Sequence, residues 1–247
     1  MQTMTLGEPA AQSWAASESN DNDNLRTIDL VDLILKDRRR LDALIRDEAR
    51  APELIPRLLA LALLGFTVFG IAATLIVNLV SPLPEWMPST RWYDRTLASL
   101  TLAYVIGLVA AAGVCLPSFY FYGLLAGVKL SMLQATAHTV KCLAVTAVVL
   151  VGALPIYVAV SMGMAVFSAP AEWMRLTIGV GLALPFVSGL WGVRSLFVGF
   201  TDLADTLPAR RQRHRATFLR RLTLAWSVCY TAVTPVMIFW LWTRFAG

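Results

Sequence analysis

The stretch CLAVTAVVLVGALPIYVAVSMGMAVFSAPA, residues 142–171, decides the fold, because its thirty residues include no Asp, Glu, Lys or Arg. A bilayer core about 30 Å thick requires roughly 20 apolar residues in helical form. Four more charge-free stretches, 58–84, 96–128, 176–193 and 222–243, are also long enough. The pattern predicts five transmembrane helices, at about 58–80, 98–122, 142–166, 175–195 and 222–243.

The composition agrees with this pattern. The chain has 247 residues, of which 57% are hydrophobic and 15% are charged. In soluble globular chains about 45–50% of the residues are hydrophobic and about 25% are charged. These values exclude a secreted disulfide scaffold, a soluble nucleotide-binding domain and a disordered protein. The predicted fold is an all-α integral membrane protein, with a bundle of five transmembrane helices at 57–247.

The segment before the first span has two parts. Residues 1–26 are polar, lack a signal-peptide pattern and predict a disordered tail. Residues 27–50 carry apolar residues at helical spacing and predict a cytoplasmic amphipathic helix. A basic cluster interrupts its apolar stripe, so the helix lies either on anionic lipid or against a protein surface.

The Lys and Arg residues predict the orientation. With the amino terminus inside, the cytoplasmic segments carry 16 of them and the external segments carry 4. Lys129 and Lys141 belong to the cytoplasmic side in this count, as a loop between the second and third spans. The positive-inside rule then predicts a cytoplasmic amino terminus and an external carboxyl terminus. An Ala- and Arg-rich chain of this size is typical of a bacterial inner membrane.

Two basic clusters on the predicted cytoplasmic side are candidate contact sites. Their residues are Arg38, Arg39, Arg40, Arg210, Arg211, Arg213 and Arg215. Each cluster can rest on anionic headgroups or bind an acidic partner protein. No aromatic residues interleave the second cluster, which argues against nucleic acid. We expect the bilayer and other membrane or cytoplasmic proteins as partners.

Small residues repeat every four positions along the second predicted span. This ridge consists of Ala103, Gly107, Ala111 and Cys115. Small residues at this spacing allow two helices to approach closely. The ridge predicts either packing within the chain or the seam of a homodimer.

The sequence offers little for catalysis. We expect no Asp, Glu or Lys deep in any span, and the three cysteines, Cys115, Cys142 and Cys229, read as packing residues. No metal-ligand spacing or phosphate-binding motif occurs, so we expect neither metal nor cofactor. The leading hypothesis is a non-catalytic scaffold or accessory subunit. The alternatives are a transporter or channel subunit for a neutral or lipidic substrate and, less favoured, an interfacial enzyme using His138, Lys141 and His214.

One region resembles a known family. Gly127, Lys129, Ser131 and Gln134 form a Gly–basic–Ser–x–x–Gln pattern, and Leu154-Pro155 follows late in the next helix. With five spans and this orientation, the chain is similar to Yip1-domain membrane proteins. The resemblance implies a non-enzymatic membrane organiser with no catalytic residue to transfer.

Overall fold

The structure is a computed structural model that describes residues 27–47, 50–79, 96–125, 131–204 and 212–246. Its helices are α2 (Thr27–Lys36), α3 (Arg38–Arg46), α4 (Ala51–Leu79), α5 (Thr96–Leu125), α6 (Met132–Val166), α7 (Ala171–Ala204) and α8 (Gln212–Ala246). Within the described ranges there is no β-strand. The helices α4 to α8 are each long and apolar enough to cross a bilayer. The prediction of an all-α chain with five such helices is therefore confirmed, and it indicates an integral membrane protein.

The chain forms two compact units, residues 1–41 and 42–247. The predicted tail at 1–26 lies outside the described residues. The predicted single helix over 27–50 is instead two helices, α2 and α3, separated at Asp37. The Asp37 carboxylate accepts a hydrogen bond from the Arg40 backbone N–H, 3.1 Å away. An Asp at this position caps the first turn of a new helix, which explains the break.

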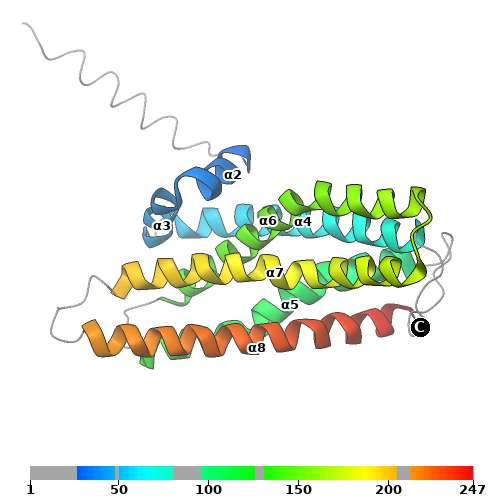
Figure 1. Cartoon of the computed structure of the whole chain (residues 1–247). Coiled ribbons are helices and arrows are strands. Elements are labelled where there is room, and N and C mark those ends of the chain that lie inside the picture. The colour runs from blue at the N-terminus through cyan, green and yellow to red at the C-terminus, as the bar shows by residue number, and fades with distance from the viewer. Residues whose placement is uncertain (1–26, 48–49, 80–95, 126–130, 205–211, 247) are drawn as a thin grey trace, which may run out of the picture. The chain divides into compact units, whose positions relative to one another are not determined.

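The five long helices lie lengthwise beside one another in the second unit (Figure 1). Their contacts follow a ring in the order α4, α6, α7, α8 and α5, which returns to α4. Smaller contacts join α5 to α6 and α4 to α7 across the ring. The neighbours in space are therefore only partly the neighbours in sequence.

Close approaches between helices involve glycines. A Cβ placed on Gly65 of α4 would lie 2.9 Å from the Cβ of Ala147 on α6. A Cβ on Gly107 of α5 would lie 2.7 Å from Cγ1 and 3.2 Å from Cα of Ile238 on α8. Because nothing larger than hydrogen fits at either position, the two helix pairs pack backbone to backbone, as small residues permit in membranes.

The third long helix begins earlier than predicted. The sequence places Lys141 in a loop and starts the span at residue 142, whereas α6 begins at Met132 and contains Lys141 within its first three turns. The loop assignment of Lys141 is wrong because charge avoidance was used to mark the boundary. The Lys141 side chain is paired inside the unit, and a paired cation can be buried.

A tight turn joins α6 to α7. The backbone N–H of Phe167 donates to the Gly163 carbonyl at 3.0 Å, and that of Ala169 donates to the Met164 carbonyl at 3.0 Å. Ser168 takes a left-handed conformation with φ of 49°. This short reversal makes α6 and α7 antiparallel neighbours.

Candidate functional site: a buried ion pair between α3 and α6

The amino terminus of α6 is fixed by a reciprocal cap. Ser131 precedes the helix in an extended conformation, and its hydroxyl accepts from the Gln134 backbone N–H at 3.2 Å. The Gln134 side-chain oxygen accepts from the Ser131 backbone N–H, also at 3.2 Å. Two of the otherwise unpaired donors of the first turn are thereby satisfied.

The same glutamine also contacts α3. Its side-chain Nε2 donates to the backbone carbonyl of Arg46, 3.4 Å away. Arg46 is the last residue of α3, and carbonyls in the last turn of a helix lack partners within the helix. Gln134 therefore provides hydrogen-bond partners for backbone groups at the start of α6 and at the end of α3.

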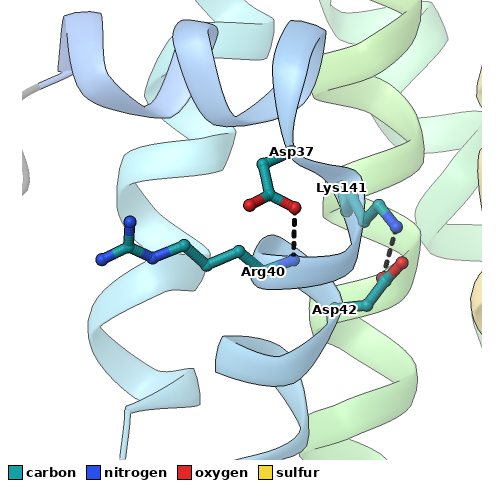
Figure 2. A network of polar contacts seen from close by, with 4 residues as sticks. All are labelled: Asp37, Arg40, Asp42 and Lys141. Carbon is teal, nitrogen blue, oxygen red and sulfur yellow. Dashed lines mark hydrogen bonds and ion pairs between the residues drawn. The ribbon is translucent and has the colours of Figure 1, made fainter.

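Asp42 and Lys141 form an ion pair two turns further along α6 (Figure 2). The Lys141 ammonium donates to Oδ1 of Asp42 across 99 residues of sequence. Their side chains are only 5% and 1% exposed, for Asp42 and Lys141 respectively. Each charge is expensive to bury alone, so each depends on the other for its place in the unit.

The two contacts determine how α3 runs along α6. Gln134 meets the end of α3 at Arg46, whereas Lys141, which lies later in α6, meets the earlier Asp42. Residue numbers increase along α6 in the direction in which they decrease along α3. The second half of α3 is therefore antiparallel to the start of α6. Asp42 and Arg46 are four residues apart and share a face of α3.

His138 lies between these contacts on α6. Residues 134, 138 and 141 are spaced by four and three, which places them on one face of the helix. His138 is 1% exposed, and both Lys141 and Arg46 act electrostatically on its ring. The face of α6 that meets α3 therefore carries polar side chains, and the Asp42 carboxylate pairs there with Lys141.

This arrangement suits a structural connection better than chemistry on a substrate. The charges of Asp42 and Lys141 neutralise each other, and both side chains are shielded from solvent. A buried ionisable residue in a helix that is long and apolar enough to span a membrane is a functional candidate by default. Here its observed partner is a residue of the segment that precedes the first span, so the pair connects that segment to α6.

The basic residues predicted to contact a partner are only partly described. Arg39 and Arg40 are exposed on α3. The side chain of Arg38 is outside the description, as are Arg210 and Arg211. Arg213 and Arg215 belong to the first turns of α8, but their side chains, like that of His214, are not described.

The predicted ridge on α5 is buried within this single chain. All four of its residues, Ala103, Gly107, Ala111 and Cys115, are buried, and Gly107 lies against α8. Beside the ridge, Trp226 Nε1 of α8 donates to the Cys115 carbonyl at 3.0 Å. The Trp226 ring stacks on Tyr230, with centroids 5.4 Å apart and ring planes 6° apart.

An apolar groove lies between α6 and α7. It has a volume of about 320 Å³. Its lining comes from both helices: Ala153, Ile156, Tyr157, Val160, Met164, Trp173, Leu176, Thr177, Val180 and Leu184. The Thr177 hydroxyl lies 2.9 Å from the Met164 sulfur and 2.9 Å from the Trp173 carbonyl, so this polar group already has partners. The remaining surface of the groove is almost entirely hydrocarbon.

Sequence reasoning missed the pairing of Asp42 with Lys141, although one signal was present. Asp42 falls between Leu41 and Ile45 on the apolar stripe of its helix, and both of those side chains are 0% exposed. A carboxylate on such a stripe requires a cation as partner. Within the described residues no group of three His, Cys, Asp or Glu side chains could hold a metal ion.

Comparison with family models, with curated proteins and with solved structures finds no match to the chain.

Proposed function

We propose that this chain is a non-catalytic multi-pass membrane protein that acts as a scaffold or accessory subunit of a membrane complex. We place it in a bacterial inner membrane with a cytoplasmic amino terminus, and we regard it as a relative of the Yip1-domain proteins. Ser131 and Gln134, two of the residues behind that resemblance, cap α6 here. A capping role gives a physical reason for a Ser–x–x–Gln pattern at this place.

The observation that carries the proposal is the attachment of α3 to α6. The buried Asp42–Lys141 pair and the Gln134–Arg46 hydrogen bond hold the second half of α3. The first turn of the same helix carries the basic cluster, in which Arg39 and Arg40 are exposed. A basic surface on an anchored helix loses less conformational entropy on binding a partner than one on a free tail.

Co-purification tests this function. The chain is extracted in a mild detergent, as wild type and as a variant with Arg38, Arg39 and Arg40 replaced by Gln. A second variant neutralises the four arginines of the 210–215 cluster. We expect a partner protein to accompany the wild type and to be lost from at least one variant, because charge complementarity sets partner choice.

Arg175 offers a matched control. It is exposed at the start of α7, at the opposite end of the predicted spans from both clusters. Arg175→Gln removes a positive charge but should retain the partner. A wild-type chain that remains solitary under gentle extraction would argue against the scaffold function.

The apolar groove favours a second candidate, a transporter or channel subunit for a lipidic substrate. Its lining is almost free of polar surface, which suits a hydrocarbon rather than a hydrated solute. Reconstituted vesicles containing a fluorescent phospholipid separate the two functions. Exchange of that lipid between leaflets faster than in protein-free vesicles would support transport, and exchange at the protein-free rate would support the scaffold.

A further inference from the structure

We propose that the groove between α6 and α7 binds one acyl chain of a phospholipid, from the leaflet on the side of the α6–α7 turn. In the predicted orientation this is the outer leaflet. The proposal requires that α6 and α7 span the membrane, as their length and composition permit. It does not depend on the scaffold function.

The length of the groove matches one leaflet. Its lining runs from Ala153 to Met164 on α6 and from Trp173 to Leu184 on α7. Each run covers eleven helical steps, which is roughly 17 Å at 1.5 Å per residue. Half of a bilayer core about 30 Å thick is about 15 Å. The groove therefore begins near the α6–α7 turn and ends near the middle of the membrane.

The width of the groove matches a single hydrocarbon chain. A volume of about 320 Å³ over roughly 17 Å gives a mean cross-section of about 19 Å². Methylene groups in contact with neighbours about 4–4.5 Å away occupy roughly 16–20 Å² each in cross-section. A helix 10–12 Å in diameter would need about 80–110 Å². The space suits an extended hydrocarbon chain, whereas a helix would enter it only with its side chains.

The two ends of the groove differ in a way that suits a lipid. Trp173, at the outer end, is 55% exposed, and tryptophan prefers the level of the headgroups. Toward the inner end, the Tyr157 side chain packs so closely on Gly181 that a Cβ there would overlap its hydroxyl. The tyrosine, itself 6% exposed, forms part of the floor near the point where an acyl chain would end.

In both helices a proline lies near the inner end of the groove. Pro155 of α6 and Pro185 of α7 both lie within a residue or two of the inner lining. Each proline removes a backbone hydrogen bond from its helix. Pro185 leaves the Gly181 carbonyl without its helical donor, at the level where Tyr157 packs. Two antiparallel helices with such interruptions at one level need not pack evenly along their length.

Photo-labelling tests the proposal. The full chain is reconstituted into nanodiscs containing a phosphatidylcholine with a diazirine at the end of one acyl chain. After irradiation, mass spectrometry locates the label. We expect it to concentrate on the peptides that contain Ala153, Ile156 and Val180, at the inner half of the groove.

A pair of valines on α7 gives a matched test. Val180 lines the groove and Val187 does not, and each is 49% exposed. Val180→Trp should reduce groove labelling at least fivefold, whereas Val187→Trp should leave it at the wild-type level. Leu176→Trp fills the groove at a second position and should act like Val180→Trp if the latter fails to fold.

Three outcomes would overturn the proposal. One is labelling spread evenly over exposed apolar residues of other helices, such as Ile106 of α5 and Val236 of α8. Another is equal labelling in folded Val180→Trp and Val187→Trp. The third is a dimer in native mass spectrometry that Val180→Trp dissociates, which would identify a second copy as the occupant.

Discussion

Replacing Asp42 by Asn should detach α3 from α6. The variant leaves the Lys141 ammonium buried without a counter-ion, at a side-chain exposure of 1%. Removing one partner of a buried pair costs about 3–5 kcal/mol. Because the pair connects α3 to α6, we expect this loss of free energy to favour local detachment of α3 rather than unfolding of the whole chain. At 1.4 kcal/mol per tenfold, the opening constant of α3 should rise about 100-fold to a few thousand-fold.

Two further variants complete a double-mutant cycle. Lys141→Met leaves the Asp42 carboxylate unpaired and should open α3 to a similar extent. Asp42→Leu combined with Lys141→Met replaces both charges by apolar side chains, and such replacements are often neutral or stabilising. The double variant should therefore open much less than either single variant, with a coupling energy of several kcal/mol.

Hydrogen exchange of peptides covering residues 41–46, measured in nanodiscs, reads this opening directly. Peptides of α5 and α8 serve as an internal reference, because those helices do not hold the pair. The exposed pair of Lys36 with Asp32, at 2.7 Å with side chains 75% and 57% exposed, supplies the control. Asp32→Asn should change the opening free energy by less than about 1 kcal/mol. Wild-type exchange in Asp42→Asn, or a double variant as labile as the single ones, would refute the reasoning.

Three other predictions concern the bundle. Gly107→Ala should lower the free energy of unfolding by about 1–3 kcal/mol, because the added Cβ would meet α8. Gly113→Ala is the control, because its Cβ would lie in open space, and it should leave the free energy of unfolding unchanged. Thermal unfolding in detergent compares the two variants. Trp226→Phe removes the donor to the Cys115 carbonyl and should cost about 0.5–1.5 kcal/mol in the same assay, so a cost near zero would contradict a role for that bond. Alkaline phosphatase fused after Gly247 should be active and green fluorescent protein dark, as the positive-inside rule predicts for an external carboxyl terminus; the reverse pattern would invert the orientation.

The fold was largely predictable because lipid imposes one strong rule. Helices that meet hydrocarbon avoid charge, so long uncharged stretches predict the spans directly. The same rule failed at Lys141, where a charge lies inside a helix because Asp42 neutralises it. A hydropathy profile averages over neighbouring residues, so it cannot show that Lys141 has a partner 99 residues away in the sequence.

The groove could not be predicted for a different reason. Its position depends on which faces of α6 and α7 turn toward each other, and in both segments nearly every face is apolar. Periodicity reveals a buried face only when another face is polar. Pro155 and Pro185 were visible in the sequence, but they do not by themselves show that space opens beside them.

The circular order of the helices has a consequence for biosynthesis. During translation α4 and α5 emerge first, and α6 then packs against α4, with which it makes its most extensive contact. The last helix touches both α5 and α7, so its arrival joins the two ends of an otherwise open arc. Until then the surface of α5 that receives α8, including Gly107, is not covered by that helix. A nascent chain halted before residue 212 would therefore expose the surfaces of α5 and α7 that α8 covers in the complete chain. Membrane chaperones could bind these surfaces, and so could a helix of another protein in a non-native contact.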